Sequence, residues 1–458
     1  MGISSLGVGS SILTQDVLDQ LRAADEAGQI TPIDLNLAHE KDKKSVLEVV
    51  DATMTNFIDS INELKSTSLY EERQTEVSGT SVEVTAAANT DVQDFTLSVA
   101  VLATKQIEES GAFTSEDELI ANAAGSMNLN IDGIDFTIDY DETTTLKGFK
   151  NLLNDVVGDK VNATIVQINS GEFRLFVSSA DTGTTQDITM TDNSAQLKDT
   201  RLTADMVAIQ NGVDAEFTFN GQAITRTSNN IDDLITGLDI TLKEIGTSAV
   251  SVSQNRDNIM EKIDSFVEKY NAAITELDKV TKVSINNTER GIFSNESTIK
   301  GMKRTIENMI SSVGGGVASL IDYGFDVDQE GKMTLDKDIL NTKLDDNSSN
   351  VEVFFSGGDF DNGDGTTTAV DGAFTEISAI VEGYTKYNAI LDQYKSSLTD
   401  LVSSLEDKKI TATERLDARY EILARQFAAY DLMISKLNSA SSMFVSIANA
   451  TTDAANNA

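Results

Sequence analysis

The sequence predicts an α+β protein of several domains, in which helical segments near both ends of the chain enclose a β-rich middle. Hydrophobic periodicity indicates this order. Apolar residues recur every three or four positions up to about residue 76, and they alternate with polar residues from 77 to 254. Helical spacing then returns from 255 onward. The β-rich domains are therefore expected to be insertions within a helical domain.

The first helical pattern lies near the N-terminus. A short amphipathic segment at 12–27 is ended by Gly28 and by the only proline, Pro32. A stronger apolar seam follows, made of Leu47, Val50, Met54, Phe57, Ile61 and Leu64. Its steps alternate between three and four residues, which is the spacing of a heptad repeat, so we expect this helix to bury one face against a partner helix.

A longer pattern, at 377–447, organises the rest of the chain. Its first part contains Tyr384, Tyr387, Leu391, Tyr394, Leu398, Leu401 and Leu405, and its second part Leu416, Tyr420, Leu423, Phe427, Tyr430, Ile434 and Leu437. The phase shifts by one residue at 406–413, which turns the apolar face by roughly 100°. A continuous helix of this length spans on the order of 100 Å. We expect the apolar residues of both parts from Leu391 onward to form coiled-coil and assembly contacts. We expect the same of the seam from Leu47 to Leu64.

The β-rich middle contains an internal repeat, at 129–153 and 217–238. Asp132-Gly133 in the first copy aligns with Asn220-Gly221 in the second, and both pairs are typical of tight hairpin turns with positive φ angles. After each hairpin we expect a short amphipathic helix, beginning near Thr145 and near Asn230.

These patterns together predict four parts. Residues 1–42 pair with 409–458 in a terminal coiled-coil stalk, and 43–76 join 255–408 in a helical domain. Residues 77–106 with 205–254 form a β-rich domain, and 107–204 form an outer β-rich domain.

Composition argues against several classes of function. The chain has 74 acidic and 35 basic residues, a net charge of −39, which disfavours binding to nucleic acid or to an anionic membrane. No apolar run approaches the ~18 residues of a membrane span, and the N-terminus lacks the features of a Sec signal. Cysteine is absent and His39 is the only histidine. We therefore expect no enzyme, no cofactor and no metal site.

Three stretches resemble the flagellar filament cap family, also called hook-associated protein 2. They are 97–113 (LSVAVLATKQIEESGAF), 323–355 (YGFDVDQEGKMTLDKDILNTKLDDNSSNVEVFF) and 419–442 (RYEILARQFAAYDLMISKLNSASS). The opening LGVGSSI and the hairpin repeat agree with the same family. The matching motifs occur in the family's order over nearly the whole chain.

The resemblance implies a structural role in motility. It implies a homo-oligomeric ring, usually a pentamer, at the tip of the bacterial flagellum, where the ring helps exported flagellin to insert and fold. It also implies secretion through the flagellar type III export apparatus, with a secretion chaperone. Two other classes stay open: a filament or hook–filament junction subunit, and a surface adhesin whose β domains mediate cell adhesion.

Overall fold

The computed structural model describes the chain except residues 1–6, 8–11, 13, 285–288 and 457–458. The chain forms two compact units, Met1–Ser66 with Met260–Ala458, and Thr67–Ile259. The first is largely helical and the second is largely β, which confirms the α+β class.

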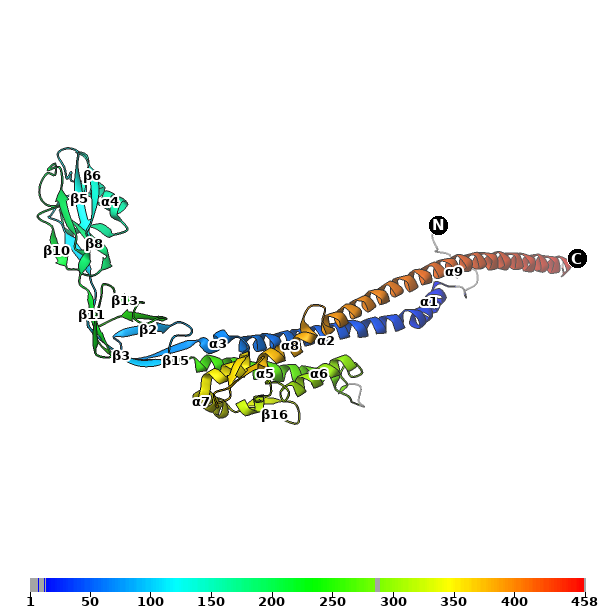
Figure 1. Cartoon of the computed structure of the whole chain (residues 1–458). Helices are drawn as coiled ribbons and strands as arrows, with labels where there is room; N and C mark the ends of the chain where they lie inside the picture. Colours follow the sequence, from blue (N-terminus) through cyan, green and yellow to red (C-terminus); the bar gives the residue numbers. More distant parts are fainter. Residues whose placement is uncertain (1–6, 8–11, 13, 285–288, 457–458) are drawn as a thin grey trace. The chain divides into compact units, whose positions relative to one another are not determined.

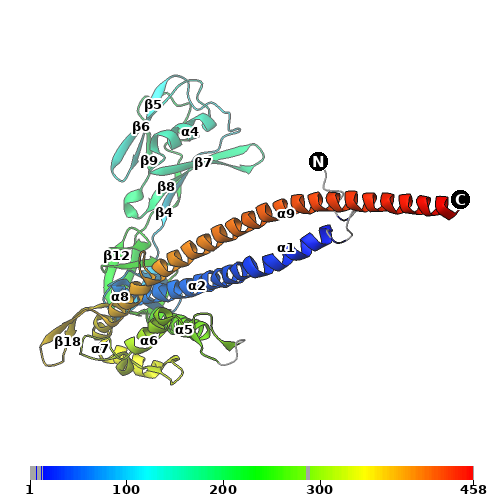
Figure 2. The ribbon, with the colours of Figure 1, turned by 90° about the vertical axis from the view of Figure 1, so that its right-hand side faces the viewer.

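The first unit is built on long helices. They are α1 (Gln15–Gln29), α2 (Thr31–Leu64), most of α5 (Arg256–Thr281), α6 (Ser297–Met309), α7 (Lys337–Ser356), α8 (Ala373–Thr385) and α9 (Ile390–Asn456). The short elements are η3 (Leu320–Tyr323) and two hairpins, β16 (Phe325–Val327) with β17 (Met333–Leu335) and β18 (Gly358–Asp361) with β19 (Thr367–Val370). Helix α2 contacts both α8 and α9 (Figures 1 and 2).

Aromatic side chains form the centre of this unit. Phe57 on α2 stacks on Phe266 of α5, with ring centroids 5.6 Å apart, and Phe266 meets Phe374 of α8 edge-on at 5.0 Å. Phe325 and Phe355 complete the cluster, and all five rings are fully buried. Each buried ring contributes roughly 1.5–3 kcal/mol, and well-oriented aromatic pairs add about 1 kcal/mol. Segments from before and after the β insertion are thereby joined in one core.

The expectation of one uninterrupted helical stretch over 377–447 is wrong at residues 386–389, where α8 ends before α9 begins. Asn388 has a φ of 60°, a left-handed conformation that asparagine adopts more easily than most residues. Its N–H donates to Asp392 (2.9 Å), and the Gln393 side chain donates to its carbonyl (2.8 Å). Tyr387, a member of the expected seam, is consequently 92% exposed. Helix α9 itself runs unbroken through 406–413, so the shift of phase there does not interrupt it.

The second unit contains four antiparallel sheets. Their strand orders are β1 (Arg73–Ser78), β15 (Gly246–Gln254), β3 (Gln93–Val101), β11 (Ala215–Phe219), β12 (Gln222–Arg226); β13 (Asn230–Ile231), β14 (Leu238–Leu242), β2 (Val82–Ala86); β10 (Val207–Gln210), β4 (Lys105–Glu109), β8 (Glu172–Thr182), β7 (Val161–Asn169); and β6 (Ile134–Tyr140), β5 (Gly125–Ile131), β9 (Thr189–Asp192). Helices α3 (Thr67–Glu71) and α4 (Leu146–Val157) and the short η1 (Thr184–Gln186) complete it. The first two sheets share one hydrophobic core, and the last two share another with α4.

Both predicted hairpin turns are confirmed. Asp132-Gly133 joins β5 to β6, and Asn220-Gly221 joins β11 to β12, with positive φ at all four residues. The helix after the first hairpin is also confirmed as α4, since the Thr145 side chain accepts the N–H of Gly148 and caps it.

The helix expected after the second hairpin is wrong. The Asn229 side chain there bonds both the N–H and the C=O of Ala103, at 2.8 Å each, which pins the chain in an extended form. Ile231 then enters β13 and pairs with Ile240 of β14. The six residues left between these strands are too few for an amphipathic helix with three buried positions.

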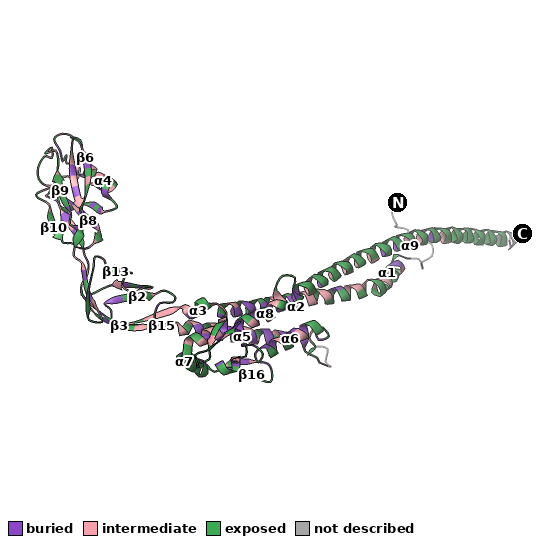
Figure 3. Cartoon of the chain, in the orientation of Figure 1, coloured by how far each residue is buried: buried purple, intermediate pink, exposed green. Residues whose placement is uncertain are grey.

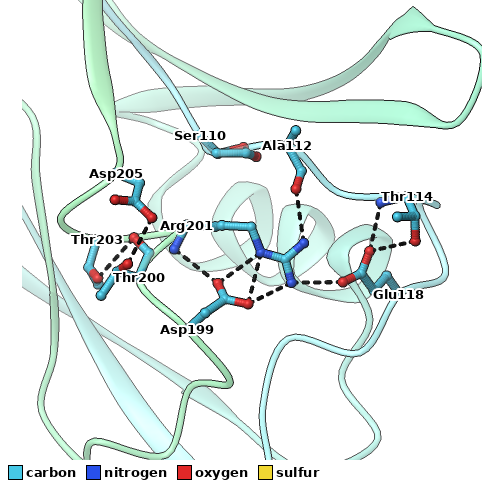
Figure 4. A network of polar contacts seen from close by, with 10 residues as sticks. Ser110, Ala112, Thr114, Glu118, Asp199, Thr200, Arg201, Thr203 and Asp205 are labelled. Carbon is cyan, nitrogen blue, oxygen red and sulfur yellow. Dashed lines mark hydrogen bonds and ion pairs between the residues drawn. The ribbon is translucent and has the colours of Figure 1, made fainter.

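One ion-pair network joins two loops beside the core that contains α4 (Figure 4). Arg201 pairs with Glu118 and Asp199, donates to the Ala112 carbonyl, and lies 3.8 Å from the ring centroid of Phe113. The hydrogen bonds from Arg201 lower the pKa of Asp199. Burial raises the pKa of Glu118, but hydrogen bonds from Arg201 and Thr114 outweigh it and hold the pKa below its usual value. Both carboxylates therefore stabilise the folded state when ionised.

We expect Arg201→Ala to lower the free energy of unfolding by roughly 1–3 kcal/mol at pH 7, because the partly buried Glu118 and the more exposed Asp199 both lose their partner. The depressed pKa values make this contribution complete above about pH 4, and it is lost as the pH falls through the lower folded-state values. Denaturant unfolding at pH 7 and at low pH measures the difference. Lys147→Ala, at a single and more exposed pair with Glu116, is the control with a smaller expected loss. An equal loss for Arg201→Ala at both pH values would assign its effect to contact with Phe113 instead.

Candidate functional site

The structure provides an extended helical surface as the candidate site. Among the described residues, no group of three or more His, Cys, Asp or Glu side chains could hold a metal ion. None of the helices, as far as they are described, is long and apolar enough to cross a membrane. The apolar seams that the sequence singled out form the candidate site.

The first seam lies inside its own subunit. Leu47, Val50, Met54, Phe57, Ile61 and Leu64 are all at most 1% exposed on the inner face of α2. They contribute to the core of the first unit, where Phe57 also contacts the ring of Tyr270 at 5.9 Å.

The first part of α9 is half covered. Leu391 and Leu398 are buried, Tyr394 and Leu405 are partly buried, and Leu401 is exposed. Tyr394 lies edge-on to Phe293, with centroids 6.0 Å apart. Burial raises the pKa of its hydroxyl, and the neighbouring Glu296 carboxylate raises it further, so this tyrosine is a neutral hydrogen-bond donor.

The second part of α9 is covered by α1. Leu416 and Tyr420 are buried with Leu18 in a small cluster, against which Leu423 and Phe427 are partly buried. Helix α1 has only 15 residues, a length at which an isolated helix is marginal in water. The apolar contact with α9 is therefore what stabilises α1.

Polar contacts set the register of α9 against both α1 and the start of α2. Tyr420 donates to Asp25 at 2.7 Å, Lys409 pairs with Asp34 at 2.6 Å, and Lys41 pairs with Glu406 at 2.6 Å. Arg22 also pairs with Asp417, and Arg419 with Asp25. The ion pairs are largely exposed, so each contributes at most about 1 kcal/mol. Because these pairs join α9 to α1 and to α2 at several successive positions, they favour one alignment of the helices over others.

Beyond Phe427 the same stripe becomes exposed by steps, since Asp431 is still buried and the residues after it are increasingly exposed. Tyr430, Leu437 and Phe444 are 57%, 71% and 74% exposed, and Ile434 between them is partly buried. Figure 3 shows the end of α9 exposed along its length. Tyr430, Leu437 and Phe444 follow one another by seven positions, and Ile434 lies four after Tyr430, so they continue the face that α1 covers further back. An exposed apolar stripe that continues a buried one indicates a contact with another molecule.

The sequence singled out Tyr430, Ile434 and Leu437 but missed Phe444 and Met433, which extend the stripe. Phe444 follows Leu437 by seven residues, so heptad spacing could have found it. Ser441, at the intervening position, interrupted the apolar pattern. Met433 lies beside the predicted seam, and only the width of the apolar face reveals it.

We expect Leu416→Ala to weaken the pairing of α1 with α9 by roughly 2 kcal/mol, at the lower end for a buried leucine because the cluster is small. Amide hydrogen exchange should then speed up along α1. Ile422→Ala, at an exposed position of the same helix, should leave exchange in α1 unchanged. Unchanged protection of α1 in the Leu416 variant would contradict the inference that this contact holds α1 in place.

Comparison with known proteins agrees with this architecture. The family models "Flagellar hook-associated protein 2 N-terminus" and "Flagellar hook-associated protein 2 C-terminus" match residues 10–106 and 212–439. The chain is 33% identical to flagellar hook-associated protein 2 of Helicobacter pylori (strain J99 / ATCC 700824) over 266 residues, which is 53% of this chain and 39% of that protein. It thus aligns with less than half the length of that relative.

Two further relatives align over more of their length. Flagellar hook-associated protein 2 of Escherichia coli K12 is 26% identical, with 96% of this chain and 97% of that protein covered. The crystal structure of the D1-D2-D3 domains of the Escherichia coli flagellar cap protein matches with a TM-score of 0.59 at 22% identity, covering 77% of this chain and 99% of that one. At that identity the structure supports the fold. With both family models in their expected order, the chain belongs to the flagellar hook-associated protein 2 family, whose members are filament cap proteins.

Proposed function

We propose that this protein caps the distal end of a bacterial flagellar filament and promotes the insertion and folding of exported flagellin. The observation that carries the proposal is the exposure of the apolar side chains Tyr430, Leu437 and Phe444 toward the end of α9. A cap needs a surface that remains free in the single chain and is buried on assembly. This stripe has that property, whereas the seam on α2 is already buried in its own subunit.

The terminal segments, 1–42 with 409–458, would act as the docking stalk. The helical domain at 43–76 with 255–408 and the two β-rich parts, 77–106 with 205–254 and 107–204, would stay outside the contact. Two separate hydrophobic cores in the second unit support the last of these divisions. A closed homo-oligomeric ring, with five copies as in the expectation from the family, would distinguish a cap from a polymerising subunit.

The proposed partners are flagellin at the filament tip, the flagellar type III export apparatus and a secretion chaperone. An exposed apolar helix end is an aggregation hazard before export, which gives a chaperone a surface to protect. The same apolar residues of α9 would bind the chaperone before export and the filament afterwards.

The docking role predicts a specific loss of function. Tyr430→Asp with Leu437→Asp places two carboxylates in the exposed stripe, where they cost little in the free subunit but several kcal/mol if buried unpaired in a contact. We expect a folded, exported protein that fails to cap, with unpolymerised flagellin shed into the medium. Filament length by electron microscopy and flagellin in the culture supernatant measure this.

The matched control is Ser439→Asp with Ser446→Asp, which adds the same charge at the same spacing on the opposite face of α9. It should leave capping intact. Full-length filaments without shed flagellin in the Tyr430/Leu437 variant would refute docking through this stripe.

Charge makes a second prediction for the ring. With −39 per subunit, neighbouring copies repel one another. We expect assembly to strengthen as salt rises, because the Debye length shrinks from ~30 Å at 0.01 M to ~8 Å at 0.15 M. Sedimentation at several NaCl concentrations measures this. A ring that dissociates with added salt would show that attractive ion pairs dominate between subunits.

A further inference from the structure

Strand β7 is an open edge of the sheet β10-β4-β8-β7, since it pairs only with β8. Its second half reads TIVQIN at 164–169, with no charged residue, proline or glycine. Native proteins usually protect such an edge with lysine, proline or a covering segment, because its free N–H and C=O groups can pair with another strand. This half of β7 has the composition of a strand that accepts a partner.

The hydrogen-bonding direction of the edge follows from one neighbouring contact. The Asn154 side chain accepts the N–H of Ala163 at 2.8 Å and donates to its C=O at 2.9 Å. Ala163 therefore directs its backbone groups away from β8. Because these groups alternate along an antiparallel strand, Ile165 and Gln167 direct theirs the same way.

The protection by Asn154 ends at Ala163. Within the described part of the chain, no hydrogen bond reaches the outward backbone groups of Ile165 or Gln167. Val166 and Ile168 point to the outer face of the sheet and are 40% and 45% exposed, while Ile165 packs on the core. An irregularity in the ladder with β8 follows Gln167, so the available edge is short.

We propose that this edge is a contact between two copies of this chain, in which β7 of one copy pairs antiparallel with β7 of the other about a two-fold axis at Val166. In this register Ile165 faces Gln167 of the second copy, and each pair exchanges both N–H···O=C bonds. Val166 faces its own counterpart as a non-hydrogen-bonded pair. The two four-stranded sheets become one continuous sheet.

A second copy of β7 fits this edge better than the other free edge of the sheet. The Ser110 N–H donates to the Leu175 carbonyl on β8, so by alternation the backbone groups of Glu109 point toward β10. Glu109 is paired with Val207 of β10, and therefore Ala208 is the residue of β10 that directs its backbone groups outward before the irregularity in the ladder. One outward residue cannot match the two on β7, whereas a second β7 matches both. The absence of charge in TIVQIN also matters, because a chain of net charge −39 repels its copies nearly everywhere else.

The contact is separate from the proposed ring. A two-fold contact uses the same patch on both copies and closes at two, so it cannot build a ring of five. It would join free subunits, or subunits of two different assemblies. Loss of capping and loss of this pairing are therefore distinguishable outcomes.

The absence of cysteine in the chain allows a direct test. Paired residues at a non-hydrogen-bonded position lie ~4.5 Å apart at Cα, within the range of a disulfide. Full-length Val166→Cys should form a covalent dimer under mild oxidation at least roughly tenfold faster than Ile134→Cys, because pairing raises the local thiol concentration. Ile134 is the control because it is 48% exposed on another strand. Equal rates, measured on non-reducing gels, would overturn the proposal.

Two further variants test the geometry. Gln167→Pro removes an outward N–H that β8 does not use. Adding Gln167→Pro to Val166→Cys should therefore abolish the faster cross-linking, while adding Gln167→Thr should preserve it.

The variants Val166→Lys and Val166→Glu, without cross-linking, should each show less dimer in sedimentation than the unchanged protein. An equal mixture of the two should regain the dimer, because only a self-paired position brings the two charges together. No recovery in the mixture, or faster cross-linking only when Ala208→Cys is also present, would reject self-pairing.

Discussion

Burial of the apolar face of α9 is the constraint on which the first unit depends. A 67-residue helix cannot bury a face of that length within itself, so every turn needs a partner. Helix α2 supplies one near Leu391 and Leu398, and α1 supplies the next near Leu416 and Tyr420. Past Phe427 the cover becomes partial, with Asp431 still buried, and Leu437 and Phe444 are exposed. The same physical demand therefore builds the subunit along part of the helix and leaves a surface for assembly along the rest.

The position of the β insertion follows from the aromatic core. Phe57 precedes the insertion in sequence, and Phe266 and Phe374 follow it, yet their rings touch. A core assembled from both sides of an insertion tolerates change in the inserted part, provided that the ends of the insertion stay close together. The second unit has its own two cores, so its stability comes from its own contacts.

Periodicity predicted most of the fold because each element buries one face. The seam on α2, the hairpin turns and α4 all follow from local spacing and turn chemistry. The failures had non-local or single-residue causes. Asn229 bonds Ala103, 126 residues away in the sequence, and removes a helix that the pattern favoured. Asn388 interrupts an otherwise helical stretch with one left-handed residue. For the candidate site, spacing located the stripe but could not tell which positions a neighbouring helix covers. That distinction depends on where α1 ends along α9.

Net charge links the two surfaces proposed for contacts. At −39, copies of this chain repel one another over most of their surface, and only segments without charge can approach closely at low cost. Residues 437–452, which hold the end of the α9 stripe, contain no charged side chain, and neither does TIVQIN on β7. One surface is helical and apolar and needs a partner of matching shape, while the other offers backbone groups and needs a strand. The negative charge over the rest of the surface disfavours other contacts between copies. Both proposed contacts are therefore selective, because their attraction has to come from local complementarity.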